Sequence, residues 1–371
     1  MFIRTIHKQT LHTAIISTAM IAVAVVMLRW PQALANGVSR GLSVCSAVII
    51  PTLYPFMILA GILTDSPLCT RPNKFMGAIT QRLFCLPACC GTAILLSFVG
   101  GYPAGAIAIG QLREKGHITA NQAQRMTLFC VNGGPGFIVS TVGAGLLGST
   151  RAGWLLFLAH AITSFGMGIL LGRQKRIQNV EERPAAVNSP RPFARTVQDT
   201  CSALLTMCGF VVLATAGLSV WEASGLPAAL QSITHVPATT WSTAAATLTE
   251  VSCGCIAIVG GGTLAPFWLC LCLGWGGLSV QGQLAIALKG GGERILTKTF
   301  WLGRLLHGGI SGLIATLLFY YIPVDLPTIT RPDSTPFYAS PSASVMLLLL
   351  SFTAMLCFYP KKTGNMSQDV L

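Results

Sequence analysis

The chain alternates between long apolar runs and short polar connections. Eight of the apolar runs are long enough to cross a bilayer as a helix, which takes about 20 residues. These runs are Leu11–Trp30, Val38–Leu63, Met126–Gly148, Ala152–Leu171, Val197–Trp221, Leu264–Leu288, Lys298–Ile322 and Ala343–Tyr359. Two further apolar stretches are interrupted near their middle: Leu86–Leu112 by the predicted breaker Gly100–Pro103, and Thr240–Gly262 by the predicted breaker Ser252–Gly254. The pattern predicts an all-α polytopic membrane protein.

Helix-breaking residues recur inside these apolar segments. Pro51 and Pro55 interrupt the second run and predict a kink or a short unwound segment there. The other predicted backbone breaks are Gly100, Gly101 and Pro103, then Gly133, Gly134, Pro135 and Gly136, and finally Gly276 and Gly277. Because freed backbone groups in lipid cost several kcal/mol unless protein or water satisfies them, we expect these breaks to line a cavity.

The distribution of Lys and Arg tests how often the chain crosses the membrane. If each of the ten apolar segments crossed once, the loops would hold 11 basic residues inside and 12 outside, which is no bias. If Leu86–Leu112 and Thr240–Gly262 are instead re-entrant hairpins, 19 basic residues lie inside and 4 outside, with Arg304 near the inner end of its span. The positive-inside rule therefore favours about eight spanning helices plus two hairpins, with both termini in the cytoplasm.

This arrangement contains a repeat. The order hairpin, span, span occurs in both halves, and an odd number of crossings between the copies inverts the second. Inverted repeats with broken helices that meet at the midplane are typical of secondary transporters. The expected divisions are 1–85 (N-terminal helices), 86–172 (first repeat), 173–197 (basic cytoplasmic linker), 198–239 (connecting span and outer loop), 240–322 (second repeat) and 323–371 (outer loop, last span and cytoplasmic tail).

Composition supports the membrane class and narrows the function. The chain is 52% hydrophobic and 9% charged, with a mean hydropathy of +0.66, which lies outside the range of typical soluble domains. Cytoplasmic loops explain the excess of 24 Lys and Arg over 11 Asp and Glu, so no nucleic-acid partner is expected. The chain has no nucleophile elbow, P-loop or HExxH motif, and we expect neither an enzyme nor a cofactor.

The cysteines and the N-terminus each leave an alternative open. Cys253 and Cys255 have a metal-like spacing, as have Cys85, Cys89 and Cys90. No His stands nearby at structural-zinc spacing, so no metal site is expected.

A basic N-terminus before an apolar run also resembles a cleaved signal peptide. An uncleaved first helix is the favoured interpretation, because the run is long enough to span and further spans follow.

Glu250 is the strongest candidate for chemistry. Of the eleven acidic residues, it alone lies well inside an apolar segment. A carboxylate at membrane depth costs roughly 2.5–3.5 kcal/mol on insertion scales and is a functional hypothesis by default. We expect it to bind a cation, a proton or a substrate hydroxyl; the alternative is a protonated or paired Glu that stabilises the hairpin. Thr249 and Ser252 add hydroxyls suited to ligand contact or helix capping. Tyr102, at the first hairpin tip, is a further candidate contact, with turn chemistry alone as the alternative reading of Gly100–Pro103.

Several other polar residues lie in apolar surroundings. Asn132 and its glycine-rich neighbours suit hydrogen bonding to a polar ligand, with a packing notch for another helix as the alternative. Ser279 and Gln281 interrupt an apolar span and are further candidate contacts. His160 and His307 are expected to be packing residues, with proton relay as the alternative.

Five motifs occur in a characteristic order along the chain. They are Ile50–Met57, Gly100–Gly105, Cys130–Phe137, Thr249–Gly254 and Gly276–Gln281. Together they resemble the YlbJ-type sporulation integral membrane proteins, which belong with the nucleoside-recognition Gate domain proteins. The resemblance implies a multi-pass protein of the bacterial plasma membrane, a sporulation-related role, and a transporter-like core similar in plan to concentrative nucleoside transporters.

Two functions of different classes fit these observations. The first is a secondary transporter or exporter of a small polar solute, nucleoside-like or ionic, that passes Asn132, Glu250 and Ser279 by alternating access. The second is a non-transporting membrane scaffold or binding component of sporulation or envelope assembly. In both, the basic linker 173–195 is expected to lie near anionic lipids. The expected partners are a small polar solute or ion and the lipid bilayer, and the sequence leaves a homo-oligomer open.

Overall fold

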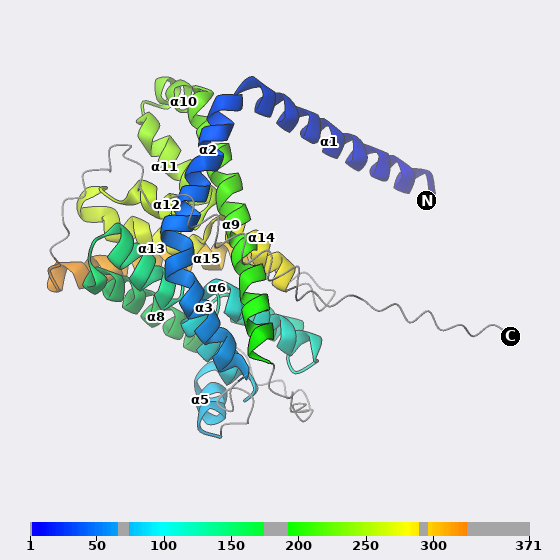
Figure 1. The fold of residues 1–371 in the computed structure, drawn as a ribbon. Helices are drawn as coiled ribbons and strands as arrows, with labels where there is room; N and C mark the ends of the chain where they lie inside the picture. Colours follow the sequence, from blue (N-terminus) through cyan, green and yellow to red (C-terminus); the bar gives the residue numbers. More distant parts are fainter. Residues whose placement is uncertain (1, 66–73, 174–191, 289–295, 325–371) are drawn as a thin grey trace.

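The computed structural model of the chain describes residues 2–65, 74–173, 192–288 and 296–324. In these residues every regular element is helical (Figure 1). The elements are α1 Phe2–Arg29, α2 Pro31–Val44, the π-helical turn η1 Cys45–Ile49, α3 Ile50–Asp65, α5 Lys74–Phe84, α6 Cys90–Glu114, α7 Ala120–Thr127, the π-helical segment η2 Gly136–Leu146, α8 Thr150–Arg173, α9 Phe193–Ala223, α10 Leu226–Thr234, α11 Ala238–Thr249, α12 Val251–Ile258, the 3₁₀ turn η3 Gly262–Leu264, α13 Ala265–Trp275, α14 Gly277–Ala287 and α15 Lys298–Tyr321. The predicted all-α class is confirmed.

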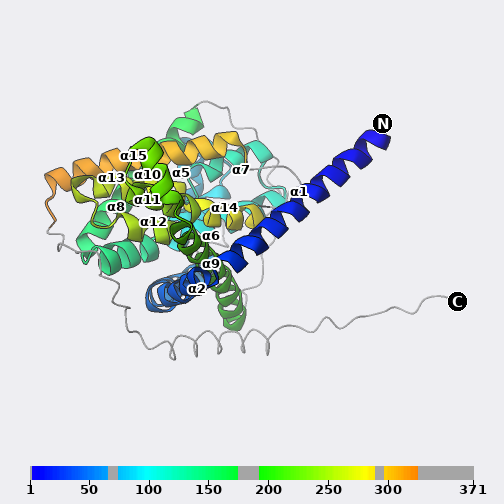
Figure 2. The same cartoon turned by 90° about the horizontal axis from the view of Figure 1, so that it is seen from above.

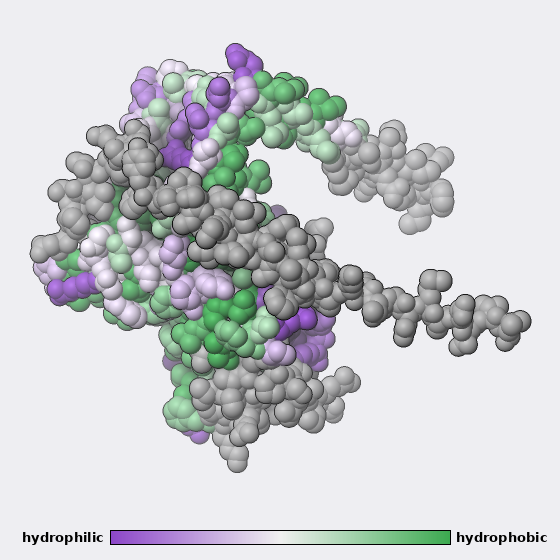
Figure 3. All heavy atoms as spheres, viewed as in Figure 1, coloured by the Kyte–Doolittle hydropathy of each residue, from purple (hydrophilic) through white to green (hydrophobic). Residues whose placement is uncertain are grey.

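Several helical stretches in the described residues are long and apolar enough to cross a membrane. These five are Pro31–Ile62, Thr150–Arg173, Phe193–Ala223, Gly262–Ala287 and Lys298–Tyr321. The first predicted span lies in α1, whose apolar part Ser17–Arg29 is shorter than these five, and α1 extends away from the other helices (Figure 1). The predicted last span, Ala343–Tyr359, and residues 174–191 of the predicted linker lie outside the described residues. Hydrophobic side chains form patches on the visible surface (Figure 3), and many large apolar side chains are exposed, as expected for a protein that faces lipid.

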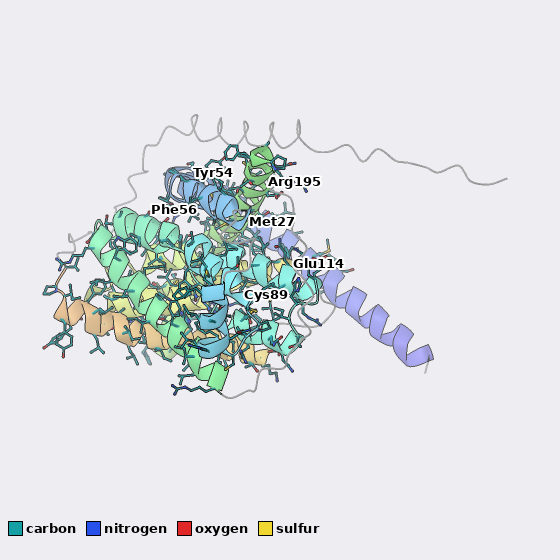
Figure 4. The ribbon with its side chains drawn as sticks, turned by 90° about the horizontal axis from the view of Figure 1, so that it is seen from below. Met27, Tyr54, Phe56, Cys89, Glu114 and Arg195 are labelled. Atoms are coloured by element: carbon teal, nitrogen blue, oxygen red, sulfur yellow. The ribbon has the colours of Figure 1, made fainter. Side chains whose placement is uncertain are left out.

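The helices α2, η1 and α3 follow one another and pack against α9. Seen from above, α2 and α9 lie at one side of the molecule and α15 at the other (Figure 2). Glycine permits the close approach, because a Cβ at Gly37 would lie 2.6 Å from the Cα of Ala216 on α9. Further along, Tyr54 on α3 lies beside α9 (Figure 4), and its hydroxyl oxygen is 3.9 Å from the Cys201 Sγ.

Of the two alternatives predicted at Pro51 and Pro55, a kink or a short unwound segment, the unwound segment is not present, because both prolines lie in helix α3. The chain instead inserts the π-helical turn η1 directly before α3. A π turn widens the helix, which accommodates the proline ring and its missing N–H without unwinding. The Thr52 hydroxyl accepts or donates a 2.6 Å bond with the Thr141 hydroxyl of η2 and also lies 2.6 Å from the Val48 carbonyl. The segment around the π turn therefore also contacts η2, through the bond between Thr52 and Thr141.

Helix α6 is broken at Gly101, and its two arms fold back against each other. Gly101 has φ 75° and ψ −161°, which is not helical. A Cβ at Gly105 would lie 2.9 Å from the Cβ of Ser97, although eight residues of a straight helix span about 12 Å. Pro103 lies near the start of the second arm, where a missing N–H costs little. Leu86–Leu112 therefore has the folded-back shape of a hairpin with its tip at Gly101.

The base of this hairpin is closed by α7. Thr119 and Gln122 form a reciprocal capping box that starts α7, at the N-cap position that the sequence suggests. Arg125 near the end of α7 then donates to the carbonyls of Phe84 and Cys85, just before the first arm. Since α7 directly follows the second arm, these bonds hold the two ends of the hairpin together.

A second hairpin is formed by α11 and α12. A Cβ at Gly254 would lie 2.8 Å from the Cα of Thr247, although seven residues of a straight helix span about 10 Å. The predicted breaker, Ser252 to Gly254, is wrong, because these residues form the first turns of α12. The break is instead at Glu250, whose backbone is extended. A side chain that can accept from an N–H of the first turn favours this position as a helix N-cap.

Each hairpin is followed by a broken segment. After α7, residues 128–134 are not helical, and η2 begins at Gly136 directly after Pro135, whose backbone is already helical, so Met126–Gly148 is not one continuous spanning helix. After the second hairpin, α13 ends at Trp275, and Gly276 and Gly277 both have positive φ before α14 continues. Of the predicted breaks, five lie where the backbone leaves helical geometry: Gly101, Gly133, Gly134, Gly276 and Gly277. The other four lie in helical backbone: Gly100, Pro103, Pro135 and Gly136.

Each hairpin with the broken segment and the helix that follow it is called a unit below; the units are residues 86–173 and 240–321. The last helix of each unit packs closely on the broken segment before it. On α8, a Cβ at Gly153 would lie 2.7 Å from the Cα of Val139 in η2. On α15, a Cβ at Gly308 would lie 2.9 Å from the carbonyl oxygen of Leu271 in α13. Small residues at such contacts let helix backbones approach within a membrane. The helices α8 and α15 also contact each other, which joins the two units.

We expect the substitution Gly101→Ala to destabilise the protein. The backbone of Gly101 occupies a region that is essentially restricted to glycine, where another residue costs about 1–3 kcal/mol. The cost should be measured as a lower Tm of the purified protein in detergent. Gly166→Ala is the matched control, since a Cβ at this glycine of α8 meets nothing within 4 Å. It should leave Tm unchanged or raise it slightly, and equal losses in both variants would contradict the break at Gly101.

Candidate functional site

Each hairpin tip packs, backbone against backbone, on the broken segment that follows it in the chain. At the first tip, a Cβ on Gly134 would lie 2.9 Å from the backbone nitrogen of Gly101. At the second tip, a Cβ on Gly277 would lie 2.8 Å from the Cα of Glu250. Approach this close requires glycine, which is the physical reason for glycine in both breaks. Tip and break therefore have the same relation in both units.

Tyr102 connects the first hairpin tip to the second break. Its hydroxyl donates a hydrogen bond to the Leu273 carbonyl, which lacks a helical partner because α13 ends two residues later. A Cβ at Gly133 would lie 3.4 Å from the Tyr102 hydroxyl oxygen, and a Cβ at Gly276 would lie 3.8 Å from its ring atom Cε1. Tyr102 therefore lies between the break at residues 133–136 and the break at residues 276–277.

Glu250 separates α11 from α12 and forms the tip of the second hairpin. Its backbone is extended, with φ −151° and ψ 134°, and its side chain is only 3% exposed. The Oε2 atom accepts a hydrogen bond from the Cys253 N–H at 2.9 Å, so Glu250 is the N-cap of α12. The positive end of the helix dipole partly compensates its charge. Within the described residues, no Lys or Arg forms an ion pair with it.

A cavity of about 50 Å³ lies where the two hairpin tips meet. Its lining includes these predicted site and break residues: Gly100, Gly101, Tyr102, Gly134, Gly136, Glu250 and Ser252. The rest of the lining is largely apolar and comes in part from α3 and α9. One water molecule needs roughly 10–15 Å³ and a drug-sized ligand roughly 300–1,000 Å³, so this cavity suits an ion or a few waters.

The other predicted contacts do not line this cavity. They are Asn132, Thr249, Ser279 and Gln281. Asn132 Nδ2 donates to the Phe129 carbonyl at 2.6 Å, and Gln281 Nε2 donates to the Trp275 carbonyl at 3.3 Å. Both amides therefore satisfy carbonyls that are freed at their own breaks. The Thr249 hydroxyl bonds back within α11, whereas the Ser279 Oγ is buried without a partner.

A larger cavity of about 340 Å³ lies beside the smaller one, between α3, α6 and α9. Met57 and Gly100 line both cavities, so the first hairpin tip forms part of the boundary between them. The larger cavity also contains the polar side chains of Gln111, Thr196 and Asp199. Its volume is sufficient for a small organic solute.

A cluster of buried polar side chains lies where α8 and α15 meet. His160 Nδ1 and His307 Nε2 are 3.1 Å apart, and their rings stack with centroids separated by 5.3 Å. Arg304, one turn before His307, is 1% exposed, and its Nη1 and Nη2 atoms have no hydrogen-bond partner. The expectation that the two histidines are separate packing residues misses this pairing. The charge count also misses Arg304, because it places this residue merely near the end of a span.

A short repeated pattern marks this group in the sequence. His160 and Ser164 on α8 have the same four-residue spacing as His307 and Ser311 on α15. Residues four apart lie on one face of a helix, so each helix carries His and Ser on the same side. All four side chains are buried. In the described part of the chain, no group of three or more His, Cys, Asp or Glu residues is arranged to hold a metal ion.

Comparison with known proteins identifies a relative. The chain is 25% identical over 321 residues to the sporulation integral membrane protein YlbJ of Bacillus subtilis (strain 168), an alignment that covers 78% of each protein. No family model and no solved structure matches the chain. The similarity supports a YlbJ-type assignment, in agreement with the five ordered motifs. With the membrane-length helices, it identifies the chain as an integral membrane protein.

The cap made by Glu250 gives a stability prediction. Glu250→Ala removes the acceptor for the Cys253 N–H and should cost about 0.5–2 kcal/mol, whereas Glu250→Gln keeps an acceptor oxygen and should cost less. The measurement is the Tm of the purified variants in detergent. Glu222→Ala, at the exposed end of α9, is the control and should leave Tm unchanged. Equal losses for the Ala and Gln variants at position 250 would show that the cap is not what Glu250 contributes.

Proposed function

We propose that this YlbJ-type membrane protein is a secondary transporter or exporter of a small polar or ionic solute, with Glu250 at its functional centre. The observation that carries the proposal is a buried carboxylate at one hairpin tip, facing a cavity that the other hairpin tip also lines. A sporulation-related role follows from the name of its relative. The protein would lie in a bacterial plasma membrane with both termini in the cytoplasm.

The energetics of Glu250 favour a functional role over a structural one. Burying an unpaired carboxylate at membrane depth costs several kcal/mol of free energy, and a helix dipole offsets at most about 2 kcal/mol of this cost. In the described residues no basic side chain supplies the remainder. Glu250 would therefore hold a proton or a cation when the site is at rest, and exchange of that ion would couple to solute movement.

The two adjoining cavities provide a route. The larger one includes Thr196 and Asp199, near the start of α9. This helix follows in sequence the basic linker, which the charge distribution predicts to be cytoplasmic. Gly100 borders both cavities, so a small displacement of the first hairpin would join them. Solute would then pass from the cytoplasmic side to Glu250, and movement of the second hairpin would open the other side.

The shape of the two units supports transport by alternating access. Each has a folded-back hairpin, a broken segment under its tip and a closing helix, which is the plan of inverted-repeat transporters. The smaller cavity suits an ion better than a nucleoside. A nucleoside-like solute, as the Gate domain resemblance implies, would have to occupy the larger cavity first.

Flux measurements test the proposal. We expect proteoliposomes with the wild-type chain to move at least one member of a panel of labelled nucleosides, phosphate and Na⁺ faster than protein-free vesicles do. Glu250→Gln should reduce that flux to the protein-free level, because an amide cannot exchange a proton or compensate a cation. Glu222→Gln, an equivalent change at an exposed Glu, should retain wild-type flux.

The alternative scaffold function predicts a different result. Wild-type flux in Glu250→Gln would contradict the proposed role of Glu250 in transport. Deletion of the middle of the 173–195 linker should leave flux intact in a transporter. If no solute is moved and this deletion alone abolishes activity in sporulation, the non-transporting scaffold would be favoured instead.

A further inference from the structure

The contact between α8 and α15 contains a buried charge that the proposed transport route does not use. Arg304 is 1% exposed, and both of its terminal guanidinium nitrogens lack a hydrogen-bond partner. Within the described residues, no Asp or Glu pairs with it. It lies six residues into α15, about 9 Å along the helix axis from Lys298. At this depth it cannot reach water as a surface arginine does.

An arginine in this position requires an anion. The guanidinium stays charged in proteins and presents five N–H donors and no acceptor. An uncompensated buried charge of this kind is strongly destabilising. The fork of N–H groups matches the paired oxygens of a carboxylate or phosphate group, which is the partner that buried arginines bind best.

The side chains around Arg304 provide further donors. The single bond between His160 Nδ1 and His307 Nε2 leaves His160 Nε2 and His307 Nδ1 without partners. If both rings are neutral, one of these free nitrogens must carry a proton and the other must not, whichever ring donates. Ser164 Oγ is also buried and unpartnered. The ring nitrogen that carries the proton can donate to an oxyanion, and so can the Ser164 hydroxyl, one turn along α8 from His160; the unprotonated nitrogen can only accept.

The position of Arg304 relative to the first hairpin tip links this cluster to the candidate site. A Cβ at Gly274 would lie 3.4 Å from the Arg304 carbonyl oxygen, and the carbonyl of the preceding Leu273 accepts the hydrogen bond from Tyr102. Tyr102 also lines the smaller cavity that contains Glu250. An anion on Arg304 would therefore lie close to the hairpin tip but apart from the carboxylate.

We infer that Arg304, His160, His307 and Ser164 form a binding site for an oxyanion, with Arg304 as the bidentate donor. The ligand is a small soluble oxyanion, such as phosphate, or the phosphate of an anionic lipid headgroup. Binding of this ligand goes beyond the proposed transport and does not depend on it. If the chain also transports, the site makes an anionic solute the expected cargo.

The test compares wild-type protein with Arg304→Met in detergent. In sodium phosphate, the wild type should melt at a higher temperature than in sodium chloride of equal ionic strength, and the shift should grow with phosphate concentration. Arg304→Met should lose this shift. In sodium chloride it should be at least as stable as the wild type, because it removes an uncompensated charge. Arg151→Met, at the exposed start of α8, is the control and should keep the full shift.

A second arm identifies the source of the anion. Native mass spectrometry should show phosphatidylglycerol retained by the wild type and lost from Arg304→Met if a lipid headgroup occupies the site. Retention without a phosphate shift assigns the lipid, and a phosphate shift without retention assigns a soluble oxyanion. If Arg304→Met fails to fold, Arg304→Lys takes its place, and a weaker response is expected because lysine cannot bind in bidentate fashion.

The inference is overturned if neither phosphate nor phosphatidylglycerol distinguishes the wild type from the Arg304 variants. It is also overturned if Arg304→Met is less stable than the wild type by the same margin in every buffer. That outcome would make Arg304 a structural residue with partners inside the protein. Loss of flux in Glu250→Gln bears on neither result, so this proposal and the transport proposal can fail separately.

Discussion

The structure depends on satisfying backbone groups that are freed where helices break inside an apolar interior. Each such group costs several kcal/mol if it is left unpaired in lipid. The Tyr102 hydroxyl donates a hydrogen bond to the Leu273 carbonyl at the second break, and the Asn132 side-chain amide donates one to the Phe129 carbonyl at the first. Glu250 accepts from the first turn of α12. The Tyr102 bond joins the first hairpin tip to the second break, whereas the Asn132 and Glu250 bonds satisfy backbone groups three residues away. Tyr102 and Glu250 also line the smaller cavity, so groups that stabilise the fold help to build the cavity.

Much of this arrangement can be predicted from the sequence, because glycine and proline mark the breaks directly. Gly101, Gly276 and Gly277 have positive φ, which other residues rarely adopt. A carboxylate in an apolar run is equally conspicuous, and Glu250 lies at a hairpin tip. The folded-back shapes follow less directly, from a charge distribution that makes sense only if two apolar stretches return to the side they enter.

Other features could not be predicted, because they depend on which groups meet in space. Whether a side-chain amide is free to bind a ligand depends on which backbone carbonyls lie near it. Asn132 and Gln281 both donate to nearby backbone carbonyls. Pro51 does not unwind its helix, because a π turn precedes it. Arg304 and the histidine pair depend on how α8 and α15 cross, although the repeated His-x-x-x-Ser spacing is a signal that sequence comparison within the chain can find.

The two ionisable groups, Glu250 and Arg304, lie in different surroundings that are connected by one residue. Tyr102 lines the cavity with Glu250, and it binds the carbonyl of Leu273, next to the Gly274 that packs on the backbone of Arg304. In our account, the two charges remain unpaired with each other because each binds something from outside the chain. A proton or cation at the carboxylate and an anion at the guanidinium would both act on the position of the first hairpin tip.

The central claim is that Glu250 is a protonatable carboxyl group that can be reached through the cavity between the hairpin tips. Dicyclohexylcarbodiimide tests it directly, because this apolar reagent forms a stable N-acylurea with protonated carboxyl groups in apolar surroundings. Peptide mass spectrometry of treated membranes should find the modification on Glu250 and not on the exposed Glu222. Glu250 without modification, under conditions that modify Glu222 or Asp199, would contradict the account.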